Sequence, residues 1–279
     1  MPITLLTDFG TADYFVGAMK GVVLSVNPDA LVLDITHEIP PHDIEAGAFT
    51  LLAVYRDFPP GTIHVAVVDP GVGSSRRPVL VVGGDQFFVG PDNGLFGYIY
   101  ERETTVRVFH LTREKYFRQP VSATFHGRDI FAPIAAALSN GVAPAELGEE
   151  IVDYVRLAPL APQATGDGKL SAKIIHIDRF GNCVTSITPQ DLPEERIENG
   201  ARLVVNGREI AAFRRFYADE TASGEELFAV WGSAGFLEIV AYRASAARLL
   251  GAQVGRTVEV RGKGRMTNGE SADAPAGRD

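Results

Sequence analysis

The feature that most constrains the fold is a change of hydropathy pattern part-way along the 279 residues. Over residues 1–140, short apolar runs alternate with longer stretches whose apolar residues recur at helical spacing. That alternation is expected of strands and crossover helices layered around a mainly parallel sheet. From residue 169 the apolar runs are short and separated by turn signals such as Asn206-Gly207, which favours a small β barrel or sandwich. The expected fold class is therefore α/β, with an N-terminal mainly parallel-sheet domain followed by a small C-terminal β-barrel domain.

Composition suggests where these domains begin and end. The N-terminal α/β domain is expected over residues 1–160, because the stretch 142–168 contains prolines, an acidic cluster and small residues that indicate a connection. The β barrel is expected over residues 169–262. Residues 263–279 contain almost no apolar side chains and are predicted to be a disordered tail.

The hydropathy pattern also predicts individual elements. Two of the N-terminal helices begin with an aspartate near the N-cap, Asp13 and Asp43, where a carboxylate can accept free backbone N–H bonds. The predicted strands of the first domain are 3–6, 31–35, 62–68, 78–82, 86–89 and 106–111, and its helices are 13–26, 43–58, 95–101 and 130–138. The predicted strands of the second domain are 173–177, 184–187, 202–205, 227–230, 236–241 and 257–261, with one short helix over 244–250.

Charge and cysteine content exclude several classes of protein. The formal net charge is −9 and the sequence pI is near 5.2, which opposes nucleic-acid binding because that binding depends on clustered Lys and Arg. Cys183 is the single cysteine, so it is expected to be a buried small hydrophobe in a reducing compartment. No apolar run is long enough to cross a bilayer, and the N-terminus lacks the basic region of a signal peptide. We expect a cytoplasmic protein with no membrane partner.

Polar residues that follow strands are the first candidates for function, because ligands of α/β sheets bind outside the carboxyl ends of the strands. Asp8 follows the first strand and can either hold both hydroxyls of a ribose or cap a turn. The loop over 69–77 follows the third strand; it is either an ordinary surface turn or a ligand-binding loop whose glycines allow a close approach of the backbone to a ligand. This loop lacks the third glycine of a dinucleotide fingerprint and the Gly-Lys-Ser/Thr of a phosphate loop.

Two further positions could contribute to a site. His126 stands at the predicted start of a helix, where the helix dipole disfavours imidazolium and could keep a neutral base; alternatively it caps the helix beside a surface pair of Arg128 and Asp129. In the second domain, Asp178, Phe180 and Asn182 lie between two strands. They either form a plain hairpin or hydrogen-bond and stack on an adenine.

The remaining histidines favour structural roles. His37 and His42 do not have the His-Glu-x-x-His spacing, and two prolines between them prevent one helix from presenting both imidazoles. His64, His110 and His176 fall in or beside predicted strands and are expected to be packing residues. We predict no metal site, and no Gly-x-Ser-x-Gly elbow or Cys/His pair indicates nucleophilic catalysis.

Five motifs in order give the chain a family resemblance. They are Thr7-Asp8-Phe9-Gly10, Val68-Asp69-Pro70-Gly71-Val72-Gly73, Gly90-Pro91-Asp92-Asn93-Gly94, Phe125-His126-Gly127-Arg128-Asp129 and Asp178-Arg179-Phe180-Gly181-Asn182. Over residues 2–262 the chain resembles the SAM hydroxide adenosyltransferases, which are relatives of the bacterial fluorinase and chlorinase. The resemblance implies an N-terminal α/β domain, a C-terminal β barrel and a homotrimer. Its active sites would lie between the N-domain of one subunit and the C-domain of its neighbour.

The resemblance also implies roles for single residues. It makes Asp69, Arg76 and His126 a catalytic set, with Arg76 preferred to Arg77 because it lies seven residues after Asp69. Further residues would bind substrate: Asp8 the ribose hydroxyls, Phe180 and Asn182 the adenine, and Ser233 the methionine carboxylate. The halogenases have an arginine after that serine, whereas this chain has Ala234.

The reaction implied is attack by water or hydroxide on the ribose C5′ of S-adenosyl-L-methionine (SAM), releasing adenosine and L-methionine. SAM is then the substrate, and no cofactor is expected. His126 would either remove a proton from the water or only orient it. Two alternatives stay open at this stage: a halide-using SAM adenosyltransferase, and a nucleoside or SAM sensor without turnover.

Overall fold

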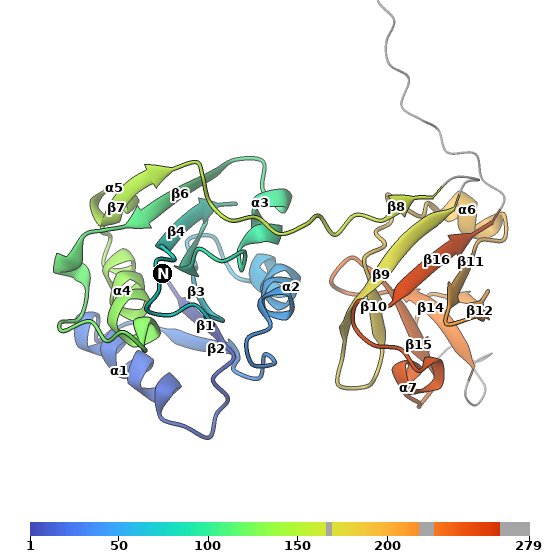
Figure 1. The fold of residues 1–279 in the computed structure, drawn as a ribbon, viewed down its shortest axis with the longest axis horizontal. Coiled ribbons are helices and arrows are strands. Elements are labelled where there is room, and N and C mark those ends of the chain that lie inside the picture. Colours follow the sequence, from blue (N-terminus) through green and yellow to red (C-terminus); the bar gives the residue numbers. More distant parts are fainter. Residues whose placement is uncertain (166–168, 218–225, 263–279) are drawn as a thin grey trace, which may run out of the picture. The chain divides into compact units, whose positions relative to one another are not determined.

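The computed structural model describes residues 1–165, 169–217 and 226–262, so the predicted tail over 263–279 lies outside the described residues. The chain divides into two compact units, Met1–Pro159 and Leu160–Asp279. Each is described by itself (Figure 1). Among the described residues, no helix is both long and apolar enough to cross a membrane.

The N-terminal unit, whose residues are all described, is built on a seven-stranded sheet of order β2-β1-β3-β5-β4-β6-β7. Strands β2, β1, β3 and β5 pair in parallel, and β6 runs in the same direction because β5 and β6 are both antiparallel to β4. The mainly parallel sheet is thereby confirmed. Its strands are β1 (Ile3–Thr7), β2 (Val32–Thr36), β3 (Ile63–Val67), β4 (Pro78–Gly83), β5 (Gln86–Pro91), β6 (Val106–Leu111) and β7 (Gly148–Ile151).

Helices cover both faces of this sheet (Figure 1). One apolar cluster contains side chains of α1 and α4 with those of β1 and β3, and a second contains side chains of α2 and α3 with those of β4 and β5. The helices are α1 (Phe15–Val26), α2 (Ile44–Val54), α3 (Gly97–Arg102), α4 (Ala132–Ser139) and α5 (Pro144–Leu147). Short 3₁₀ turns cover Tyr55–Asp57 and Glu114–Tyr116, and a π-helical turn over Gly127–Phe131 leads into α4. This layering places the exits of β1 and β3 at one edge of the sheet.

The two predicted aspartate caps have different outcomes. Asp43 is the N-cap of α2, and its carboxylate accepts a 2.9 Å bond from the backbone N–H of Ala46. Asp13 does not cap α1, because this helix begins at Phe15 after Tyr14, which makes no side-chain cap bond. The first helix is therefore held by packing of Val16, Met19 and Val23 rather than by a polar cap.

The predicted connection over 142–168 is wrong for its first part. Residues of that stretch form α5 and β7, and β7 pairs antiparallel with β6 to complete the edge of the sheet. The short sequence of β7, Gly-Glu-Glu-Ile, has no apolar alternation because an edge strand with two exposed glutamates needs little burial.

The C-terminal unit is a curled, mainly antiparallel sheet, in which only β13 and β14 pair in parallel among the described strands, and it confirms the predicted β domain as a half-barrel. Within its described residues the pairing order is β12-β11-β16-β9-β10-β15-β14-β13, with β8 also on β9. The strands are β8 (Gln163–Ala164), β9 (Leu170–Ile177), β10 (Cys183–Thr185), β11 (Arg202–Val205), β12 (Arg208–Ile210), β13 (Phe213–Arg214), β14 (Leu227–Trp231), β15 (Leu237–Ala241) and β16 (Thr257–Arg261). The helices are α6 (Glu194–Glu198) and α7 (Ala246–Leu250).

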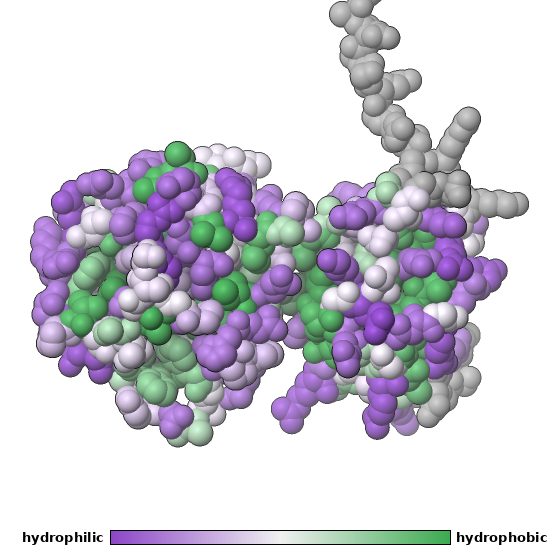
Figure 2. Space-filling view, viewed as in Figure 1, coloured by the Kyte–Doolittle hydropathy of each residue, from purple (hydrophilic) through white to green (hydrophobic). Residues whose placement is uncertain are grey.

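Each unit has its own apolar core. The C-terminal core contains Ile174, Leu203, Ile239 and the single cysteine, Cys183, which is buried as expected; burial raises the pKa of its thiol to about 11. On the face seen in Figure 2, hydrophilic side chains dominate and apolar ones form small patches. Most of the apolar side chains are thus buried in the cores of the two units.

Candidate active site

The three residues of the predicted catalytic set meet at the carboxyl edge of the N-terminal sheet. Asp69 lies two residues beyond β3, Arg76 lies two residues before β4, and His126 directly precedes the π-helical turn. The Arg76 Nε donates to both carboxylate oxygens of Asp69, at 2.9 and 3.0 Å, and its Nη2 also bonds Asp69. The same Nη2 lies 2.8 Å from His126 Nδ1. Arg76 therefore links the acid to the imidazole.

This cluster is shielded from water. The side chain of Arg76 is 9% exposed and that of Asp69 is 5% exposed, and the guanidinium lies 5.4 Å from the centre of the Phe131 ring. The Arg76 Nη1 atom is buried and has no hydrogen-bond partner among the described residues. A buried N–H donor without a partner is costly unless a ligand or water accepts it, so this atom marks a place for an oxygen or an anion.

Arg77, the neighbouring arginine, points to other partners. It donates to Asp92 at 2.7 Å and to Asp153 at 2.9 Å, and Asp92 also accepts the backbone N–H of Val155. Arg77 thus fastens the segment after β7 to the loop after β5. The structure brings Arg76, and not Arg77, to Asp69 and His126.

Two contacts fix the loop that carries Asp69 and Arg76. Gly73 has a φ of +78°, and a Cβ built there would lie 2.2 Å from the backbone oxygen of Ala123, so only glycine fits. This close approach holds the 69–77 loop against the segment that carries His126. On the other side, the side-chain amide of Asn93 donates to the backbone oxygen of Val68 at 2.8 Å. The motif over residues 90–94 therefore fixes the backbone next to Asp69.

Asp129 fixes the segment around His126, and it is a fully buried residue rather than half of a surface pair. Its carboxylate accepts bonds from Arg118, Arg128 and the backbone N–H of Ser122. Burial opposes ionisation of this carboxyl, but the hydrogen bond from Arg128 and the others outweigh it, so the pKa of Asp129 lies below its ordinary value. The charged network keeps the residues before the helix in place.

The protonation state of His126 follows from its contact with Arg76. A guanidinium can only donate, so His126 Nδ1 must accept, and the proton of the neutral imidazole then sits on Nε2. Burial lowers the pKa of His126, and the charge of Arg76 lowers it further, against the opposing effect of Asp69 and Asp129. The imidazole is accordingly neutral and presents a donor, Nε2–H.

Asp8 lies at the exit of β1, on the same edge of the sheet. Its Oδ2 accepts the backbone N–H of His42 at 2.9 Å, and the backbone N–H of Gly10 donates to the oxygen of His37. Below this loop, the buried His37 bonds the hydroxyl of Thr7 at 2.9 Å. His37 and His42 therefore shape the loop around Asp8, as the structural interpretation of these histidines predicts.

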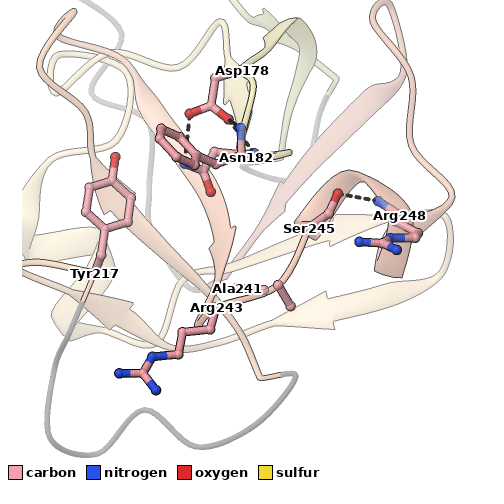
Figure 3. A pocket seen from close by; sticks show the side chains of 9 residues that line it. Asp178, Asn182, Tyr217, Ala241, Arg243, Ser245 and Arg248 are labelled. Carbon is pink, nitrogen blue, oxygen red and sulfur yellow. Dashed lines mark hydrogen bonds between the residues drawn. The ribbon is translucent and has the colours of Figure 1, made fainter.

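The C-terminal unit contains a pocket of about 590 Å³ (Figure 3). The predicted residues Asp178, Phe180 and Asn182 line it, and the ring of Phe180 is 77% exposed. Sequence reasoning missed the other lining residues, which come from segments without a recognisable motif: Tyr217, Ala241, Arg243, Ala244, Ser245 and Arg248. An exposed aromatic ring beside polar groups in a concave site is suited to a planar heterocycle.

The loop that carries these residues is organised by Asp178. Its Oδ1 accepts the backbone N–H groups of Phe180 and Asn182, both at 2.9 Å, and its Oδ2 accepts the side-chain amide of Asn182 at 2.9 Å. Gly181, with a φ of +84°, closes the turn where a Cβ would collide with Ser245. Asp178 therefore shapes the pocket through its own loop.

Ser233 lies elsewhere. It occupies the exposed turn between β14 and β15 and is not among the residues that line the pocket. Nearby, Glu238 is buried and accepts the Tyr217 hydroxyl at 2.7 Å, and burial raises the pKa of its carboxyl. Among the described residues no group of three or more His, Cys, Asp or Glu side chains is placed to hold a metal ion.

One of the other predicted packing histidines, His64, lies in the core. His64 is fully buried, bonds Thr4 and Gln86, and stacks on Phe88. Burial lowers its pKa to about 4. His64 is therefore a core histidine, as predicted.

Comparison with known proteins identifies the same family in both units. The model of the SAM hydroxide adenosyltransferase N-terminal domain matches residues 3–148, and that of the C-terminal domain matches residues 172–259. A relative from Methanocaldococcus jannaschii named (R)-S-adenosyl-L-methionine hydrolase is 36% identical over 89% of this chain and 91% of its own length. A fluorinase from an Actinoplanes species is 28% identical over 74% of this chain and 78% of its own.

A solved structure supports the same assignment. The crystal structure of a Thermotoga maritima protein superposes with a TM-score of 0.86 at 32% identity, covering 92% of this chain and 99% of the other. Both domain models match in order and together span most of the sequence. On these grounds the chain belongs to the SAM hydroxide adenosyltransferase family.

Proposed function

We propose that this protein hydrolyses S-adenosyl-L-methionine to adenosine and L-methionine. The oxygen of water or hydroxide forms a bond to the ribose C5′ while the C5′–S bond breaks. The electron pair of that bond goes to sulfur, and methionine leaves as a neutral thioether. Because the sulfonium is already an activated leaving group, no acid and no cofactor is needed, and SAM is the substrate.

The observation that carries this proposal is the Arg76 guanidinium, which bonds Asp69 and His126 and keeps Nη1 buried and unpartnered within the described residues. Water is a very weak acid, so hydroxide is scarce at neutral pH and the site must stabilise it. A buried cationic donor does so by charge and by hydrogen bonding.

In this arrangement His126 orients the nucleophile and does not remove its proton. Its Nδ1 lone pair is taken by Arg76, and its Nε2 carries the remaining proton. Nε2–H and Arg76 Nη1–H are then two donors for one hydroxide, whose proton has already gone to solvent. Asp69 holds the guanidinium in place and balances its charge.

The remaining predicted residues would bind the substrate. Asp8 would accept the ribose hydroxyls, and the exposed ring of Phe180 with the amide of Asn182 would bind the adenine. Ser233, with its place outside the lined pocket, would contact the methionine carboxylate only from the β14–β15 turn. We assign Asp178 the role of holding the loop that carries Phe180 and Asn182, and no direct contact with the substrate.

We further propose a cytoplasmic homotrimer. In it the adenosyl group contacts Asp69, Arg76 and His126 of one subunit and binds in the C-terminal pocket of a neighbouring subunit. Support comes from the division of groups: the charged set lies in the N-terminal unit and the aromatic pocket in the C-terminal unit. The buried, reduced Cys183 suits a reducing compartment.

The reaction can be tested by incubating the purified protein with each sulfonium epimer of SAM in ¹⁸O water. We expect the label in the 5′-hydroxyl of adenosine and unlabelled methionine, with no halogenated nucleoside when chloride or fluoride is in excess. SAM incubated without protein corrects for spontaneous breakdown.

Each other product has a distinct meaning. A 5′-halogenated nucleoside as major product would show a halide transferase, and stoichiometric SAM binding without product would show a sensor. Label outside the 5′ oxygen would refute attack at C5′.

A further inference from the structure

The amide of Asn182 can bind in only one orientation. Asp178 offers two carboxylate oxygens, which are acceptors, and Oδ2 faces the Asn182 side chain at 2.9 Å. The amide must therefore turn its NH₂ group toward Asp178. Because Oδ1 lies on the opposite side of the amide carbon, it points away from Asp178, as Figure 3 shows.

Asp178 is itself fixed in position. Its Oδ1 accepts the backbone N–H groups of Phe180 and Asn182, which are part of the same turn. The carboxylate thus cannot rotate without losing two backbone bonds, and its second oxygen stays toward the Asn182 amide. Asn182 is nearly buried, so no water can readily replace that bond.

We infer that Asp178 is a positioning residue that makes this pocket select a 6-aminopurine over a 6-oxopurine. The inference rests on the proposed binding of an adenosyl group in this pocket. An adenine presents an N–H donor at position 6, which matches the amide oxygen of Asn182. A 6-oxopurine presents an oxygen at position 6, which would face Asn182 Oδ1 with no hydrogen between them.

The carboxylate of Asp178, rather than Asn182 alone, sets this choice. An asparagine amide by itself can turn by 180° and offer either a donor or an acceptor. The exposed Phe180 ring stacks on either purine and does not discriminate. The discrimination therefore requires the acceptor-only partner behind the amide.

The isosteric substitution Asp178→Asn tests the inference directly. The two backbone N–H groups would keep the amide oxygen of residue 178, so its NH₂ would face Asn182. The Asn182 amide would then turn over and present its own NH₂ to the ligand. We expect the wild-type chain to bind adenosine at least about tenfold more tightly than inosine, and the variant to reverse or abolish that preference.

The measurement is titration calorimetry of the full-length protein with adenosine and with inosine. Asp191→Asn is the matched control, because Asp191 accepts from Thr188 in a turn of the same unit outside the pocket and should leave the preference unchanged. If Asp178→Asn is poorly folded by thermal unfolding, Asn182→Ala replaces it, and the two affinities should then agree within about threefold.

The outcomes separate the two proposals. Adenosine binding with an unchanged preference in the variants would overturn the role of Asp178 and leave the pocket assignment intact. A wild-type chain that binds neither nucleoside would overturn the pocket assignment and the inference with it.

Discussion

The two parts of the proposed active site are built on opposite principles: the N-terminal half-site is the cluster of Asp69, Arg76 and His126, and the C-terminal half-site is the pocket that contains Phe180. In the N-terminal unit Asp69, Arg76 and His126 are joined by hydrogen bonds, and the side chains of Asp69 and Arg76 are less than one tenth exposed. In the C-terminal unit the pocket is open and its Phe180 ring is 77% exposed. Groups that stabilise charge in a reaction are most effective when they are preorganised and shielded from water. An aromatic ring that stacks on a base can be exposed to solvent until the ligand covers it. Substitutions in the two half-sites should therefore affect different quantities.

The largest effect is expected from Asp69→Ala in the shielded half-site. Removal of the carboxylate frees the Arg76 guanidinium to leave His126 and the nucleophile, so turnover should fall by roughly 100-fold or more. Adenosine affinity should stay within about threefold, because the stacking pocket is untouched. Steady-state kinetics and calorimetry measure the two quantities. Near-normal turnover would remove Asp69 from the mechanism.

The next effect concerns how rigidly the 69–77 loop is held at Gly73. Gly73→Ala places a Cβ 2.2 Å from the backbone oxygen of Ala123 at a φ of +78°, which should cost about 2–4 kcal/mol of unfolding free energy and reduce turnover. The control is Gly200→Ala, where φ is +84° but nothing lies within 4 Å of the added Cβ. It should cost only about 1 kcal/mol. Equal costs by chemical denaturation would show that the two loops are not held together at Gly73.

The smallest effect concerns the open half-site. Phe180→Ala should weaken adenosine binding by about tenfold, since stacking of one base on an aromatic ring contributes about 1–3 kcal/mol. Its unfolding free energy should change by less than about 0.5 kcal/mol, because the ring is mostly in solvent. Phe216→Ala is the matched control, an exposed ring that does not line the pocket. A comparable loss of affinity in both variants would mean that Phe180 makes no stacking contact.

Some features were determined by the sequence alone. Apolar periodicity predicted the sheet and its crossover helices, because burial of alternate or helically spaced side chains leaves a local signature. The exits of predicted strands located Asp8 and Asp69, since parallel strands bring their carboxyl ends to one edge, and the predicted start of a helix located His126. The turn with Asp178, Phe180 and Asn182 was likewise visible between two short strands.

Other features were decided only by tertiary structure. The resemblance preferred Arg76 to Arg77 only by its spacing from Asp69. The fold gives the two arginines different partners, because Arg76 meets Asp69 whereas Arg77 meets Asp92 and Asp153. The tautomer of His126 depends on Nη2 of a residue fifty positions away. The edge strand β7, the lining residues Tyr217 and Arg243 and the place of Ser233 also depend on contacts between distant segments. Long-range contacts of this kind leave no local period, because they are set by how packed layers meet and not by neighbours along the chain.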